Sequence, residues 1–209
     1  MAATTTPTST LSTAFGADPG VERVYDNVQV QVPSVMLSAV KLALWNTIED
    51  FYIQSTMCRE HVFWKMAAGV QTIDFNPFDE SRTVAWVLDF SGVGKGKIEP
   101  PAVLRDLTFP VPEIERGGEA WLALKPVSFD AVACHACGDL WSSWFETILA
   151  GTLYRLYSQP AKPYSSPLLA QVNSSIYRRG IASARDTARR GFTAGRPVGF
   201  PYFARGGRR

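Results

Sequence analysis

The spacing of apolar residues changes twice along this chain, and that change limits what the chain can fold into. Between Leu37 and Phe51, apolar side chains recur every three or four residues, which is the period of one helix face. Between Arg82 and Phe90 they alternate, which is the period of a strand. The helical period returns after Asp139. The sequence therefore predicts a helix, then a sheet, then further helices.

Two of these helices are expected at about residues 34–55 and 139–158. Ser34 and Asp139 can begin them, because their side chains accept hydrogen bonds from the first helical N–H groups. The first helix should bury one apolar stripe along roughly five turns. That stripe comprises Leu37, Val40, Leu44, Ile48 and Phe51, and it leaves out Trp45 and Tyr52.

A third helix is expected at about residues 166–190. Ser166 is a good cap, and Pro167 suits the first helical position, where a proline is favoured. Two small residues one turn apart in its second half should let another backbone come close. The predicted inner stripe consists of Leu169, Val172, Ile176, Gly180 and Ala184.

The middle of the chain, about residues 60–125, is expected to form a small antiparallel sheet. Turn signals separate its strands, and the gaps between them are too short for a helical crossover. The predicted strands span residues 61–66, 70–75, 82–90 and 120–125. A stretch rich in Gly and Pro at 94–119 is predicted to be a long loop, and loops of that length are usually functional or ordered by a partner.

The composition supports a sizeable core. The chain has 209 residues, 46% of them hydrophobic, and no internal repeat. Its six tryptophans are more than one core usually needs, so some are expected at an interface. The expected fold class is α+β: mainly a helical bundle with an inserted small antiparallel β-sheet and extended N- and C-terminal arms. The arms span residues 1–20 and 193–209, and the folded domain spans residues 21–192.

The positive charge of the chain is concentrated at its C-terminal end. From Arg178 onward there are nine arginines against one aspartate, a net charge of +8, and because the whole chain carries +2, the rest must carry −6. Such an end needs an acidic partner, which is either nucleic acid or the acidic body of a neighbouring subunit. Arginine forms bidentate pairs and stacks on aromatic rings, which suits lasting contacts better than solubility does.

Two groups of residues are therefore candidate contact sites. The first is an extended arm that mixes arginine with aromatic residues, a composition that suits docking on another protein and also suits nucleic acid. The arm comprises Phe192, Arg196, Phe200, Tyr202, Phe203, Arg205, Arg208 and Arg209. The second group lies on the preceding helix, for contacts with a subunit or with DNA, and comprises Arg178, Arg179, Arg185, Arg189 and Arg190.

All cysteines and histidines lie in two short clusters. Cys58 and His61 form one cluster, and Cys134, His135 and Cys137 form the other. These are zinc-ligand spacings, and three thiolates with one imidazole would make a structural zinc site. The two clusters are on different elements with nothing to show that they meet, so no metal or cofactor is favoured. A zinc-stabilised interaction domain remains an alternative function.

Other patterns do not indicate an enzyme. Cys134 and His135 are neighbours in sequence, but no nucleophile-elbow glycine pattern accompanies them. The segment from Ser91 to Lys97 lacks the spacing and the hydroxyl residue of a phosphate-binding loop. Three cysteines are too few for a disulfide framework, which predicts a reducing compartment. There is no signal-peptide pattern and no apolar run long enough to span a membrane, so the chain is expected to be soluble.

Several segments of the chain resemble a known family. The first predicted helix, running into the segment Thr56–Trp64, is similar to the start of the head-to-tail adaptor (connector, or neck) proteins of tailed bacteriophages. The later segments Ile148–Tyr157, Pro163–Ala170 and Tyr177–Ala184 resemble them more specifically, as a helix, a proline-containing turn and a long closing helix. The resemblance covers about residues 30–192, is weaker in the middle, and does not include the Cys and His clusters.

The resemblance implies a structural virion protein and not an enzyme. It implies a homo-oligomer, a dodecameric ring in the virion neck, assembled in the host cytoplasm without a membrane or a cofactor. The portal protein and the tail nozzle or tube proteins would be its partners, and the C-terminal arm would reach the portal. Packaged DNA would pass through the lumen without sequence-specific contacts. A nucleic-acid-binding module that uses the arginine-rich helix and tail is the other alternative.

Overall fold

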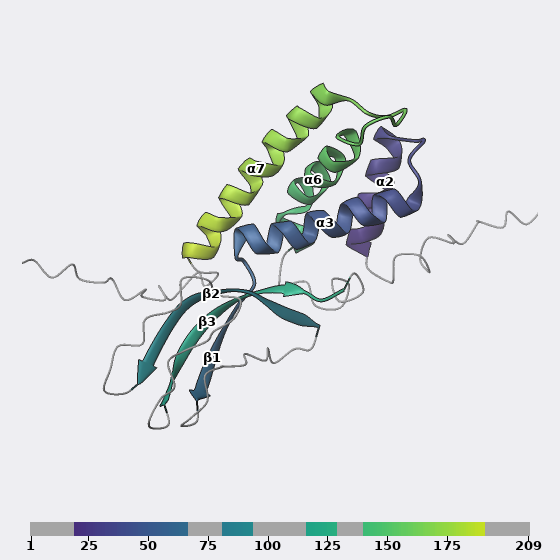
Figure 1. Ribbon diagram of the computed structural model, residues 1–209. Helices are drawn as coiled ribbons and strands as arrows, with labels where there is room; N and C mark the ends of the chain where they lie inside the picture. The colour runs from purple at the N-terminus through teal and green to yellow at the C-terminus, as the bar shows by residue number, and fades with distance from the viewer. Residues whose placement is uncertain (1–18, 67–80, 94–115, 129–139, 191–209) are drawn as a thin grey trace, which may run out of the picture.

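The computed structural model describes residues 19–66, 81–93, 116–128 and 140–190, and within them the fold is α+β, as the changes of period predict. Helices form a bundle, and an antiparallel sheet is inserted between the helices of the first and last thirds (Figure 1). The helices are α2 (Pro19–Gln31), α3 (Leu37–Ser55), α5 (Leu140–Ser143), α6 (Phe145–Tyr157) and α7 (Pro167–Arg190). The strands are β1 (Arg59–Met66), β2 (Arg82–Val93) and β3 (Arg116–Pro126).

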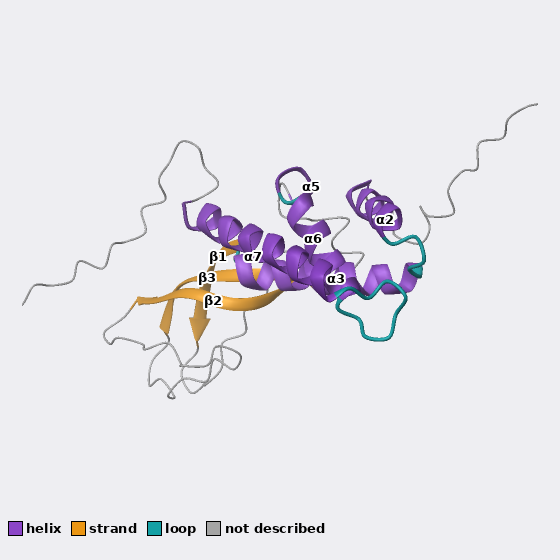
Figure 2. Cartoon of the chain, turned by 90° about the horizontal axis from the view of Figure 1, so that it is seen from above, coloured by secondary structure: helices purple, strands orange, loops and turns teal. Residues whose placement is uncertain are grey.

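Helix α6 occupies the middle of the bundle. Helices α2 and α7 lie on opposite sides of it, and α3 crosses beneath (Figures 1 and 2). The sheet extends away from the bundle beside the C-terminal ends of α3 and α7 (Figures 1 and 2). The junction of these two helices with the sheet is therefore the place where the layers of the molecule meet.

Helix α2 was not among the predicted elements, since most of its residues fell between the predicted N-terminal arm and the first predicted helix. Its buried residues Val21, Val24 and Val28 recur at helical spacing, and all are fully buried. Valine is only a moderate helix former because its branched Cβ restricts the side chain. Burial against the rest of the bundle, rather than intrinsic propensity, therefore stabilises this helix.

Helix α3 begins at Leu37, later than predicted, and ends at Ser55, where it was expected to end. Its predicted stripe is buried except for Leu37, which is only partly buried. Tyr52 is buried as well, so its predicted place off the stripe was wrong. Thr56 takes the left-handed conformation after the helix, with a φ of 52°, and its N–H donates to the Tyr52 carbonyl at 3.1 Å.

The sheet has the strand order β1-β3-β2, so β3 is central. Both pairings are antiparallel, with His61 opposite Trp121 and Trp86 opposite Ala123. Register shifts interrupt the β2–β3 pairing on either side of Trp86 and Val87. The predicted strand at 70–75 lies outside the described residues.

The core draws on the helices and the central strand together. Leu122 and Leu124 of β3 are fully buried, because β3 lies against α3. The largest fully buried helical side chains are Val21, Val24, Val28, Leu44, Ile48, Phe51, Leu140, Ile148 and Leu156. None of the helices in the described ranges has the length and apolarity needed to span a membrane.

Candidate interaction surface on helix α7

The side of α7 that packs on the bundle differs from the predicted one. The buried residues of α7 are Ala170, Tyr177, Ile181, Ala184 and Ala188. Of the predicted inner stripe, only Ala184 is buried, whereas Leu169, Val172 and Ile176 are exposed. The helix has two apolar stripes, and the prediction chose the one with larger aliphatic side chains. The buried stripe consists of three alanines with Tyr177 and Ile181, because α7 approaches α6 closely.

The close approach is visible at two glycines. A Cβ atom on Gly180 of α7 would overlap the side chain of Thr147 of α6. A Cβ atom on Gly151 of α6 would overlap both Thr47 of α3 and the ring of Tyr177. The predicted close approach at Gly180 is therefore present, against the side chain of Thr147.

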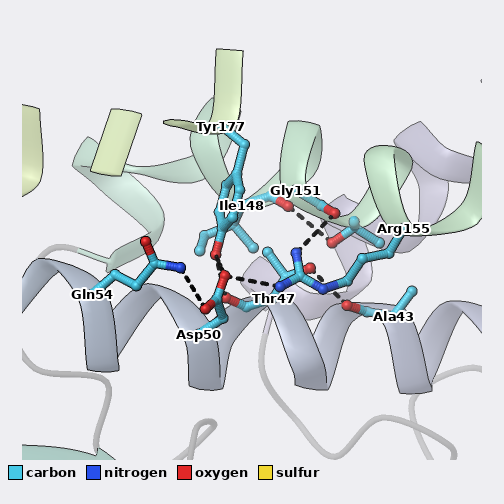
Figure 3. Close-up of polar contacts among 9 residues, drawn as sticks. Ala43, Thr47, Asp50, Gln54, Ile148, Gly151, Arg155 and Tyr177 are labelled. Carbon is cyan, nitrogen blue, oxygen red and sulfur yellow. Dashed lines mark hydrogen bonds and ion pairs between the residues drawn. The ribbon is translucent and has the colours of Figure 1, made fainter. Parts of the chain in front are cut away.

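A partly buried group of polar side chains around Asp50, which we call the Asp50 cluster, fixes how α7 is rotated about its axis. Asp50 of α3 accepts hydrogen bonds from Arg155 of α6 at 2.9 Å and from the hydroxyl of Tyr177 at 2.9 Å (Figure 3). The same hydroxyl lies 3.0 Å from the carbonyl oxygen of Thr47, and Gln54 donates to the second oxygen of Asp50 at 2.6 Å. Three helices thus meet at one carboxylate, so α7 cannot turn without breaking these bonds.

The chemistry of this cluster suits a structural role. Burial, and then the neighbouring carboxylate of Asp50, raise the pKa of Tyr177 far above its ordinary value, so the phenol stays protonated and donates. Arg155 balances the charge of Asp50 and also stacks near the Tyr177 ring, 5.3 Å from its centroid. The hydrogen-bonding capacity of the cluster is therefore used to join α3, α6 and α7.

With the helix fixed in this rotation, an apolar stripe points to solvent. Leu168 is 70% exposed, Val172 is 49% exposed and Ile176 is 37% exposed. Successive residues of this set are four apart, so they lie on one face of the first half of α7. We call Leu168, Leu169, Val172 and Ile176 the α7 stripe. A row of exposed aliphatic residues on one helix is a candidate contact surface.

The second half of α7 carries the predicted arginines. Arg178, Arg179, Arg185, Arg189 and Arg190 are all exposed. Residues 178, 185 and 189 are spaced by seven and four, which places them on one flank of the helix, whereas Arg179 and Arg190 lie on another. Helix α7 thus exposes apolar side chains in its first half and arginines in its second half.

An open pocket lies where α3, β2 and the end of α7 meet. Its volume is about 550 Å³, and Arg59, Arg185 and Arg189 line it together with Trp86 and Leu88. Trp86 is 47% exposed, which leaves much of its ring available. We call this the arginine pocket. Sequence reasoning identified the two arginines on α7 but missed Arg59 and Trp86, because only the fold brings these residues to α7.

A second, apolar pocket of about 510 Å³ lies between α3 and the end of β3. Leu42, Trp45 and Val127 supply its apolar walls, and Leu42 is 60% exposed. Leu42 is two residues from buried Val40, so it points to the opposite side of α3 from the core. We call it the α3 pocket. It is a different surface from the α7 stripe.

The predicted zinc ligands do not form a metal site among the described residues. Cys58 is disulfide-bonded, so its sulfur is not the thiolate that zinc requires, and His61 pairs with Glu119 at 3.3 Å. Cys134 and Cys137 lie outside the described residues, and the described ones contain no cluster of potential metal ligands.

The predicted docking arm is not part of the described structure. All of its residues, Phe192, Arg196, Phe200, Tyr202, Phe203, Arg205, Arg208 and Arg209, lie outside the described residues. The arm therefore stays a prediction from composition.

No protein-family model matches this chain, and no curated protein matches it either.

Proposed function

We propose that this chain is a structural assembly protein, a head-to-tail adaptor subunit that joins the portal of a tailed bacteriophage to its tail as part of a homo-oligomeric ring. The α7 stripe is the observation that carries the proposal. It exposes a row of large aliphatic side chains on a helix whose rotation is fixed by the Asp50 cluster. A protein that worked alone would gain stability by turning these side chains inward or replacing them with polar ones.

The arrangement of elements supports the same proposal. The resemblance implied a helical bundle with an inserted β-element and a long closing helix. The chain has this order, with the sheet inserted between α3 and α5 and with α7 as the last described helix. A shared order of elements supports the proposal only by analogy of fold, whereas the exposed apolar surfaces are specific to this chain.

The two apolar surfaces suit a ring. The α7 stripe and the α3 pocket are different surfaces on different elements. A heterologous contact, in which one surface of a copy meets a different surface of the next, generates closed rings when the rotation between copies closes. Packing of Leu168 and Val172 against the Leu42 and Trp45 walls of the next copy would bury both surfaces at once.

Assembly with the portal protein of the same virus tests the proposal. The full chain and the portal are mixed, and the particles are counted by negative-stain electron microscopy and sized by sedimentation velocity. We expect rings that contain several copies of the chain, seated on the portal. Removal of residues 193–209 should abolish attachment and leave the fold intact. A chain that stays monomeric both alone and with the portal would exclude the proposal.

A matched pair of variants connects this outcome to the α7 stripe. The double variant Leu168→Ser and Val172→Ser should stop ring assembly while its thermal midpoint stays within about 2 °C of wild type, because both residues are exposed. Val30→Ser is the control, since Val30 of α2 is also exposed but belongs to neither apolar surface. We expect it to assemble like the wild type. If the double variant assembled as well as Val30→Ser, the α7 stripe would not be part of the ring interface.

A nucleic-acid-binding module is the second candidate function, and the exposed arginines of α7 favour it. It predicts DNA binding whose affinity falls steeply with salt, with a slope set by the number of phosphates contacted. Fluorescence anisotropy with a duplex oligonucleotide at several salt concentrations measures both quantities. No binding at low salt would reject this function, while steep salt dependence without ring assembly would favour it over the adaptor.

A further inference from the structure

The arginine pocket concentrates positive charge at one place. Arg59 enters from the segment after α3, and Arg185 and Arg189 enter from the end of α7. Burial lowers the pKa of Arg59, and the positive charge of Arg189 lowers it further. Three guanidinium groups that line one pocket repel each other, so an anion among them would be strongly favoured.

Two of these guanidinium groups are held in place by hydrogen bonds. Arg185 donates from Nε and Nη2 to the Gln54 carbonyl at 3.0 and 2.8 Å. Arg59 donates from Nε to the Thr56 carbonyl at 2.8 Å and from Nη2 to its hydroxyl at 3.1 Å. Both groups are anchored by the C-terminal end of α3 and keep N–H groups that these bonds do not use. Groups oriented in advance lose little entropy when a ligand binds.

Among the described residues that line the pocket, none is acidic. Within the described part of the chain, the ion pairs are His61 with Glu119, Lys125 with Glu49, and Arg155 with Asp50. None of these three ion pairs involves Arg59, Arg185 or Arg189. The charge of the pocket is therefore left for a group from outside the described fold.

We propose that the arginine pocket binds a carboxylate side chain presented by a second copy of this chain. The inference rests on the proposed ring assembly and adds a charged contact to its apolar ones. The chain itself supplies the complementary charge, because the part before Arg178 carries −6 while the part from Arg178 onward carries +8. Arginine forks pair with carboxylates in a bidentate geometry, and Trp86 and Leu88 offer an apolar wall for the stem of that side chain.

A carboxylate suits the pocket better than a nucleic-acid backbone does. Phosphates of a duplex follow each other along a convex surface and are met by rows of cations that reach outward. Here Arg59, Arg185 and Arg189 line one open pocket together with Ile53, Trp86 and Leu88, and Arg59 and Arg185 are hydrogen-bonded to the C-terminal end of α3. A single anionic group attached to an apolar stem fits this shape.

Two neighbouring residues of α7 give a matched test. Arg189 lines the pocket and Arg190 does not, although both are exposed and adjacent. The quantity measured is the chain concentration at which half of the copies are assembled, in the assay described above and at two salt concentrations. We expect Arg189→Glu to raise it about tenfold, which corresponds to about 1.4 kcal/mol, and Arg190→Glu to raise it less than about threefold. The effect of Arg189→Glu should shrink at high salt.

A second pair tests the apolar wall of the pocket. Trp86→Ala should weaken assembly, whereas Trp121→Ala should not, because Trp121 is a partly exposed tryptophan that does not line the pocket. Circular dichroism spectra and thermal midpoints should show that all four variants fold.

The outcomes separate this inference from the proposed function. Equal effects of Arg189→Glu and Arg190→Glu, with assembly still lost in the α7-stripe variant, would overturn the carboxylate contact and leave the ring assembly standing. A chain whose wild type never assembles would overturn both. Loss of affinity for a duplex oligonucleotide in Arg189→Glu, with assembly unchanged, would assign the pocket to nucleic acid instead.

Discussion

Removal of one hydroxyl group from the polar cluster should measurably loosen the bundle. The hydroxyl of Tyr177 lies 2.9 Å from Asp50 and 3.0 Å from the Thr47 carbonyl, and the residue is only 3% exposed. Hydrogen bonds to charged groups contribute about 1.5–3 kcal/mol each, and water cannot easily replace a partner at this depth. Tyr177→Phe should therefore lower the free energy of unfolding by about 2 kcal/mol.

Urea denaturation followed by circular dichroism measures this free energy. The midpoint should move to lower urea with an unchanged slope, and the thermal midpoint should fall by about 6 °C. Tyr164→Phe is the matched control, because its hydroxyl bonds the neutral side chain of Gln159 at 2.8 Å in a part-buried place. We expect a loss below about 0.5 kcal/mol there.

A double-mutant cycle with Asp50→Asn then isolates the contact between the two side chains. We expect a coupling free energy of about 1 kcal/mol or more, because the two side chains are direct partners. If Tyr177→Phe unfolds within about 0.5 kcal/mol of wild type, the cluster does not fix α7, and the outward orientation of the α7 stripe loses its structural explanation.

Three further outcomes follow from the same contacts. Because the pKa of Tyr177 is raised in the folded state, its contribution to the free energy of unfolding is complete below its ordinary pKa of 10.0 and is lost as the pH rises above that value. In urea titrations at alkaline pH, the wild type should lose up to about 1.4 kcal/mol of stability per pH unit more than Tyr177→Phe. Gly180→Ala should destabilise the chain by about 1–3 kcal/mol, since its Cβ would overlap Thr147, and calorimetry would show a lower thermal midpoint unless α7 shifts freely. Ser166→Ala should cost about 0.5–1 kcal/mol in urea, because the Ser166 hydroxyl accepts from the Leu169 N–H at 3.4 Å at the start of α7; an unchanged midpoint would mean that this cap adds nothing.

The sequence predicted the elements better than their faces. Ser166 and Pro167 predicted the start of α7, and the alternation of apolar and polar residues predicted β2. Both signals are local, because each is contained within one segment of the sequence. The inward face of α7 depends instead on what α6 presents to it. Gly151 and Thr147 leave room only for small residues and the ring of Tyr177, and no pattern within α7 contains that information.

The residues of the arginine pocket, too, could be predicted from the sequence only in part. The arginines of α7 were identified from composition and periodicity, since charge clustering is visible in one dimension. Arg59 and Trp86 are far from them in the sequence, and the pocket exists only because β2 and the start of β1 lie beside the end of α7. Helix α2 was missed for a related reason, since its valines are weak local signals and become decisive only when Val21 and Val24 are buried.

The central position of β3 has a consequence for biosynthesis. Strand β1 ends at Met66, but its partner β3 begins only at Arg116, whereas β2 ends at Val93, much nearer to β3. During translation at about 5–20 residues per second, β1 is made seconds before β3, the strand with which it pairs within the described residues. The pairing of β2 with β3 is thus expected to form first. Strand β1 then pairs with the other edge of β3 as the last step in the folding of the sheet.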